Sequence, residues 1–202
     1  MIRISASPRH AATALIAACL FTGCLVVGAP AVVRAQTATA NSPADAVAAK
    51  RAAMERLAYL VGEWEGEGWM QMGGQRLTFR GGERVQSRLG GLALLVEGDF
   101  TSRPPGATRD VPVHQTLGVI TFDEATSTYR FATWLATGAT GSYTLELRPD
   151  GWRWHIDVGA GTVRYTATFP GDEWVEIGEF SRDGANWDQF FEMRLRRVAA
   201  GT

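Results

Sequence analysis

After Gly62 the hydrophobic pattern of the chain has a period of two residues, interrupted at short intervals by glycine, proline and aspartate. Alternation of this kind indicates strands with one buried face, and the turn signals indicate an antiparallel sandwich or barrel. Consecutive strands joined by tight turns favour an up-and-down order, and closing the sheet removes its exposed edges. The pattern therefore predicts an all-β, up-and-down antiparallel barrel of about ten strands over residues 61–198. The clearest alternating runs are 115–122 (QTLGVITF), 129–136 (YRFATWLA), 142–148 (SYTLELR), 152–158 (WRWHIDV) and 163–169 (VRYTATF).

One segment before the strands has helical periodicity. Apolar residues recur at helical spacing within residues 44–60, and Ser42 or Asp45 can cap the first turn. We expect a single N-terminal helix there, covering one end of the barrel. Residues 36–43 (QTATANSP) are small and polar, which is typical of a flexible lead.

The first 35 residues have the features of an export signal. Arg3 and Arg9 precede an apolar run over residues 11–28, and the chain then reads Val-Arg-Ala at 33–35. This predicts a signal peptide over residues 1–35, cleaved after Ala35, and a periplasmic or secreted protein. Two alternatives stay open. LFTGC at 20–24 is close to a lipoprotein box with Cys24 as the lipidated residue, and the apolar run is long enough to span a bilayer uncleaved.

Cysteine usage and charge exclude several classes of function. Both cysteines, Cys19 and Cys24, lie in the leader, so the mature chain has neither disulfides nor thiol chemistry. Removal of the three leader arginines leaves 17 of the 20 basic residues against 21 acidic ones, a formal charge of −4. Nucleic acid and anionic membrane surfaces are therefore not expected as partners, and membrane contact is expected only through the leader or a lipid on Cys24.

The start of the strand region, GEWEGEGW at 62–69, carries glycines where a strand would place side chains. Within a strand, Trp64, Gly66 and Gly68 share one face, and the glutamates lie on the other. Glycine inside a strand marks a bend or the close approach of another backbone. We expect the first strand to curve strongly here, with Trp64 filling the closed end of the barrel beside the helix.

The same stretch carries a family resemblance. Gly62-Glu63-Trp64 is similar to the G-x-W signature at the start of calycin barrels, which include lipocalins and fatty-acid-binding proteins. The resemblance implies that an arginine on the last strand packs over Trp64, a role that Arg194 or Arg196 would take here. LAYLVGEWEGEG, the LGG at 89–91, the LGVITFD at 117–123 and the final basic strand also resemble an exported bacterial family of unknown function with a lipocalin-like or nitrobindin-like barrel. This resemblance covers residues 57–198.

Catalytic and cofactor chemistry have little support. His155 shares a strand face with Asp157, and the opposite face is apolar. An outward, solvated His155 is favoured because the apolar face of a strand usually points inward. No metal site is expected, because the mature chain has two distant histidines and no cysteine. Nitrobindin-like barrels hold haem on a histidine near the chain's end, but residues 190–197 (FFEMRLRR) contain none, so no haem or other cofactor is predicted.

The aromatic content is high, and most of these side chains are expected to fill the barrel interior, but a ligand site remains open. Barrels of this size are just wide enough to hold one small molecule, and such pockets are lined by aromatics with a few polar groups. The sequence predicts a non-enzymatic exported barrel that binds a small apolar or amphipathic molecule. Trp134, Phe131 and Trp154 are the expected wall residues, and Arg130 and Arg80 are expected to meet a carboxylate head group.

Two other functions remain open on the sequence. One is a barrel enzyme of hydrolase or isomerase type that uses His155 with Asp157. The other is a filled barrel whose surface acts as an interaction module.

Overall fold

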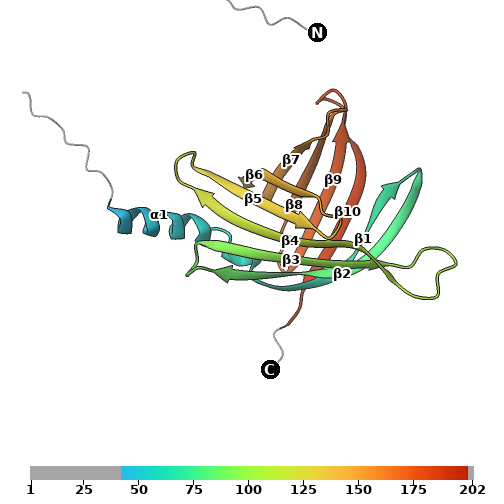
Figure 1. The fold of residues 1–202 in the computed structure, drawn as a ribbon, viewed down its shortest axis with the longest axis horizontal. Helices are drawn as coiled ribbons and strands as arrows, with labels where there is room; N and C mark the ends of the chain where they lie inside the picture. The colour runs from blue at the N-terminus through green and yellow to red at the C-terminus, as the bar shows by residue number, and fades with distance from the viewer. Residues whose placement is uncertain (1–41, 200–202) are drawn as a thin grey trace, which may run out of the picture. The chain divides into compact units, whose positions relative to one another are not determined.

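A computed structural model describes residues 42–199 and shows an all-β barrel with one short α-helix (Figure 1). The helix α1 spans Pro43–Glu55, and a 3-10 turn follows at Ala58–Leu60. The strands are β1 (Gly62–Met72), β2 (Gln75–Arg88), β3 (Ala93–Ser102), β4 (Val111–Asp123), β5 (Thr128–Leu135), β6 (Thr140–Arg148), β7 (Gly151–Asp157), β8 (Thr162–Thr168), β9 (Glu173–Ser181) and β10 (Asp188–Arg197).

The strands form a closed antiparallel barrel in chain order. Each strand pairs with the next, and β1 pairs with β10 to complete the circuit, with Trp64 opposite Arg197. Figure 1 shows the strands following one another around the barrel from green to red. The fold predicted from the period-two pattern is confirmed, because ten antiparallel strands close into a barrel in up-and-down order. Closure pairs both edges of the sheet, so no edge is left as a template for aggregation.

The helix begins with a capping box. Ser42 Oγ accepts a hydrogen bond from the Asp45 backbone N–H, and the Asp45 carboxylate accepts one from the Ser42 backbone N–H, with Pro43 in the first turn. These contacts satisfy two of the backbone donors that a helix start leaves free. The helix is shorter than the predicted 44–60, because it ends at Glu55 and the chain then continues through the 3-10 turn.

The end of the helix and the 3-10 turn after it close one end of the barrel core. Met54, Leu57 and Leu60 are buried and belong to the same apolar cluster as the inward side chains of the strands. Tyr129 donates a hydrogen bond from its hydroxyl to the Ala53 carbonyl at 2.7 Å. The last turn of the helix and the segment that follows it therefore close this end of the barrel, whereas most of the helix is exposed, unlike the predicted cover.

The glycines of β1 lie where β10 crosses closely. A Cβ atom on Gly66 would stand 2.1 Å from the backbone oxygen of Arg194 and 2.9 Å from the Leu195 Cα. No side chain fits at that distance, so this crossing requires glycine. The pattern of glutamate and glycine in 62–69 is thus explained by an outward acidic face and an inward face that must stay thin.

Trp64 is the anchor of the closed end, but its arginine partner is not one of the two predicted. The Trp64 ring is 1% exposed, donates from Nε1 to the Leu60 carbonyl at 2.9 Å, and has the Arg197 guanidinium 4.1 Å from its centroid. Arg197 also donates to the backbone carbonyls of Val61 and Tyr59.

The prediction of Arg194 or Arg196 was wrong because of strand alternation. Both alternate outward from the buried Leu195, and they pair with Glu192 at 2.6 Å and Glu173 at 2.5 Å. Arg197 has the inward parity of Leu195.

Arg197→Ala is expected to lower the free energy of unfolding by about 2–3 kcal/mol, because it removes a cation–π contact and two charge-assisted hydrogen bonds. The matched control is Arg196→Ala, one residue away, which removes an exposed ion pair and should cost about 0–1 kcal/mol. Urea denaturation of the two variants measures both values. Equal losses would contradict the assignment of Arg197 to Trp64.

Several predictions fall outside the described residues. They are the leader, its cleavage after Ala35, the lipidation of Cys24 and most of the 36–43 lead. Within residues 42–199, no helix has the length and apolar character needed to cross a membrane.

Candidate functional site

The barrel interior contains a cavity of about 240 Å³. Its wall is mostly aromatic and aliphatic, and its polar exceptions are few. The aromatic residues of the wall are Phe79, Phe100, Phe131, Tyr143, Trp152, Trp154, Tyr165, Trp174, Phe190 and Phe191, together with His114. A volume somewhat below the ~300–1,000 Å³ of common ligand pockets fits one small molecule.

The floor of the cavity is a cluster of perpendicular aromatic rings. Trp152 and Trp174 meet at 5.5 Å and 88°, and Trp64 packs on the far side of Trp174 at 5.8 Å and 88°. Phe169 fills the space among them. Trp152 and Trp174 border the cavity, whereas Trp64 and Phe169 do not, so the cluster bounds the cavity on the side of Trp64. Edge-to-face rings at these distances are a preferred packing.

The side wall presents aromatic faces and edges. Trp154 and Tyr165 stack at 4.7 Å with an angle of 17° between the rings, and Phe131 meets Trp154 edge-on at 5.5 Å. Tyr143 lies against the same indole at 4.8 Å.

Glycine on neighbouring strands makes room for these rings. A Cβ atom on Gly118 would stand 2.7 Å from the Phe131 ring, and one on Gly178 would stand 2.8 Å from the Tyr165 ring.

Two carboxyl groups stand in this apolar wall, Glu83 from β2 and Glu176 from β9. Burial, with a smaller contribution from the charge of Glu176, raises the pKa of Glu83 to about 8. Burial also raises the pKa of Glu176 to about 7, against the opposing effect of the Trp154 and Trp174 indoles. Both groups favour the protonated form more than an ordinary glutamate, because the interior solvates a charge poorly.

Neither carboxyl is well satisfied by the protein. Glu83 Oε2 is buried and has no hydrogen-bond partner. Glu176 Oε1 accepts from Trp154 Nε1 at a long 3.4 Å, and Trp174 Nε1 favours its charged form without reaching hydrogen-bond geometry. Buried polar groups are normally paired, so an unpaired carboxyl oxygen marks a place that a ligand can complete.

Gly98 provides the space in which the Glu83 carboxyl lies. A Cβ atom at position 98 would stand 2.7 Å from Glu83 Oε1 and 2.9 Å from Oε2. The side chain thus reaches from β2 over the backbone of β3, and any larger residue at 98 would displace it.

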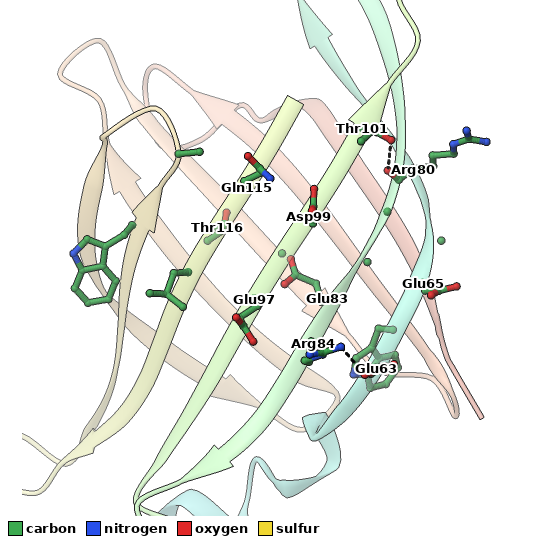
Figure 2. A pocket seen from close by; sticks show the side chains of 18 residues that line it. Glu63, Glu65, Arg80, Glu83, Arg84, Glu97, Asp99, Thr101, Gln115 and Thr116 are labelled. Carbon is green, nitrogen blue, oxygen red and sulfur yellow. Dashed lines mark hydrogen bonds and ion pairs between the residues drawn. The ribbon is translucent and has the colours of Figure 1, made fainter. Parts of the chain in front are cut away.

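An open groove of about 1060 Å³ lies outside the barrel over β1 to β5. Figure 2 shows its outward side chains and the Glu83 side chain reaching from β2 towards β3. The barrel wall is thin here because Gly81, Gly82 and Gly98 contribute no side chain, so Glu83 borders both the groove and the cavity. The groove is wide and charged, whereas the cavity is less open and mostly apolar, and the cavity is the candidate site. The acidic residues of the groove are Glu63, Glu65, Glu83, Glu97 and Asp99.

The predicted wall residues divide between the two sides of the barrel. Phe131 and Trp154 line the interior cavity. Trp134 is 46% exposed and borders the outer groove. Its expected place inside the barrel is corrected by strand alternation, since the buried Tyr129 and Thr133 put the odd positions of β5 inward and position 134 outward.

The predicted head-group arginines also point outward. Arg80 is paired with Asp110 on the surface, and Arg130 donates to Ser142 Oγ at 2.9 Å from an exposed position. Neither borders the cavity, so an inward role for them was wrong. Both alternate with buried neighbours, Phe79 and Tyr129, and they keep their charge in water, which avoids the cost of burial.

His155 and Asp157 lie on the outer face of β7. The His155 side chain is 37% exposed, with Nδ1 4.0 Å from Glu146 Oε1, and Asp157 Oδ1 accepts from the Gly159 backbone N–H at 2.9 Å. Neither residue borders the cavity, where the opposite face of β7 places Trp152, Trp154 and Ile156. In the part of the chain that the structure describes, no group of three or more His, Cys, Asp or Glu side chains is arranged to hold a metal ion.

The sequence interpretation missed the two interior carboxyls, although a signal for each was present. Glu83 lies on the same strand face as the buried Phe79 and Val85, and Glu176 lies on the same face as the buried Trp174. An acidic residue with the parity of a buried aromatic is unusual, because burial of a charge is costly. That parity would have identified both.

The comparisons with known proteins give a fold relationship. No protein-family model matches the chain, and no curated protein matches it. Among solved structures, the chain is similar to the one titled "Crystal Structure of Rv2717c from M. tuberculosis", with a TM-score of 0.53 and 14% sequence identity. The match covers 73% of this chain and 98% of that chain. At this identity the similarity shows a shared barrel fold.

Proposed function

We propose that this protein is an exported, non-enzymatic barrel that binds one small, largely apolar molecule in its interior. The observation that carries the proposal is the interior cavity, whose wall of aromatic rings contains two incompletely paired carboxyls. Apolar surface with a few convergent polar groups is the usual composition of a small-molecule site. The calycin-like signature Gly62-Glu63-Trp64 and the leader are consistent with a lipocalin-like binding protein outside the cytoplasm.

The two other functions have weaker support. An enzyme using His155 and Asp157 would need them beside a bound substrate, and they face solvent on the other side of β7. A surface interaction module would have a solidly filled barrel, whereas this interior has room for a ligand.

A cavity-filling substitution tests the proposal. Thr133 is buried, points inward from β5 and borders the cavity, so Thr133→Phe should fill the space and reduce the affinity for phenylpropanol at least tenfold, measured by isothermal titration calorimetry. The matched control is Thr144→Phe, an exposed outward position on β6, which should leave binding unchanged.

The result that would overturn the proposal is a folded wild-type protein that binds no small apolar probe. Equal affinities in the two variants would place binding outside the barrel. Native mass spectrometry of protein purified from its own host would also weigh any co-purified molecule and locate the cleavage of the leader.

A further inference from the structure

The charge of the cavity wall has one sign. Among its residues, all within the described part of the chain, Glu83 and Glu176 are acidic and none is Lys or Arg. The arginines of β2, β5 and β10 that alternate outward carry their charges to the surface. A ligand inside the barrel therefore meets carboxyl groups without a compensating cation from the protein.

The two carboxyls act on the same space. Glu83 on β2 and Glu176 on β9 both border the interior cavity, and the strand β1 next to β2 has glycine at inward positions 66 and 68. Glu83 Oε2 remains without a donor, and Gly98 leaves the room for that carboxyl. A hydrogen-bond partner for that oxygen must therefore be supplied by the ligand.

The aromatic wall favours a positive charge as well. The stacked pair Trp154 and Tyr165 and the adjoining Tyr143 present ring faces and edges beside Glu176, to which Trp154 donates. Ring faces attract cations, most strongly when water is excluded. Carboxylates and aromatic rings around one cavity are the features that recognise an ammonium group.

We propose that the ligand is an organic cation, a protonated amine on a small apolar body, whose ammonium group is held between Glu83 and Glu176. The proposal rests on the proposed function and names its ligand class. The apolar body fits the aromatic wall, and the ammonium group supplies the hydrogen bond that Glu83 Oε2 lacks.

Two other head groups fit less well. A carboxylate would meet two acidic groups and no inward Lys or Arg, so it would be repelled or would force protonation. A neutral acceptor could use the unpaired indole N–H groups of Trp152 and Trp174 or accept a hydrogen bond from protonated Glu83, but it would bring no positive charge to the ring faces. Only a donor with positive charge satisfies the carboxyl and the ring faces together.

A matched series of probes tests the head group in the wild-type protein. Phenylpropylamine, phenylpropanol and phenylpropionate differ mainly at the head group, and all three are titrated calorimetrically at about pH 8. The amine is expected to bind roughly tenfold or more tightly than the alcohol, and the carboxylate more weakly than the alcohol, as charge-assisted hydrogen bonds and cation–π contacts predict.

Isosteric variants then show which carboxyl groups cause the preference for the amine over the alcohol. Glu83→Gln and Glu176→Gln should each reduce the ratio of the affinity for the amine to the affinity for the alcohol towards one. Glu97→Gln is the control, because Glu97 is exposed on β3 next to Gly98 and faces the outer groove.

The outcomes separate the two proposals. If the alcohol or the carboxylate binds at least as tightly as the amine, the amine assignment is wrong and the binding function stands. If Glu97→Gln, rather than the interior variants, removes the preference, the amine binds in the outer groove and the assignment is also wrong. If none of the three probes binds, the binding function itself fails.

Discussion

Trp64→Ala is expected to cost the barrel about 3–5 kcal/mol of its free energy of unfolding, the usual loss for a large aromatic side chain removed from a core. The ring is 1% exposed, packs against Trp174 and Phe169, and donates a hydrogen bond to the Leu60 carbonyl. Its removal opens a cavity at the closed end and leaves Arg197 without its aromatic partner. Such a loss is a large share of the ~5–15 kcal/mol stability of a typical domain.

Urea denaturation of four variants checks this result: Trp64→Ala, Arg197→Ala, their combination and a control. His155→Ala is the control and should change stability by less than about 0.5 kcal/mol, because the side chain lies on the outer face of β7. Trp64→Ala combined with Arg197→Ala should cost less than the two single losses together, since the two side chains touch. A neutral Trp64→Ala, or fully additive losses, would contradict the role of Trp64 as the anchor of the closed end.

The fold was predictable because local rules determine it. Alternating runs specify strands, glycine and proline pairs specify the turns between them, and consecutive antiparallel strands leave few alternative topologies. The capping residue Ser42 and the Gly66 crossing could also be identified, since each depends on a few neighbouring residues.

The site was less predictable because it depends on which face of each strand is inside. Arg80, Arg130 and Trp134 face outward because of strand alternation. The composition of these strands did not show which of the two alternating sets of positions faces inward. Glu83 and Glu176 border the same cavity although they are 93 positions apart, and no local pattern in the sequence brings them together.

The stability of the ligand-free protein is expected to fall as the pH rises from about 5 to about 9. The ordinary value of 4.5 applies to both glutamates in the unfolded chain, whereas the folded-state pKa is about 8 for Glu83 and about 7 for Glu176. Between these values the folded protein binds more protons than the unfolded chain, so each increment of pH favours unfolding. The stabilisation is complete below the unfolded pKa and is lost by the time pH exceeds the folded one.

The other titratable groups on the cavity wall do not cancel this fall of stability with rising pH. Burial lowers the pKa of His114, which makes stability rise with pH, but that effect ends near its unfolded value of 6.5. Burial raises the pKa of Tyr165 above its usual range, so the hydroxyl stays neutral. Above about pH 7 the two glutamates therefore determine the slope that arises from the cavity.

The double variant Glu83→Gln and Glu176→Gln should remove most of that slope. Each pKa unit corresponds to ~1.4 kcal/mol, so the wild-type protein should lose a few kcal/mol across the window and the variant much less. At about pH 9 the variant should be the more stable protein, because an amide avoids the cost of a buried charge. The control Glu97→Gln, which changes an exposed carboxyl of the outer groove, should keep the wild-type slope. Urea denaturation at a series of pH values measures all three proteins, and equal slopes would show that the two interior carboxyls are hydrated and ionise normally.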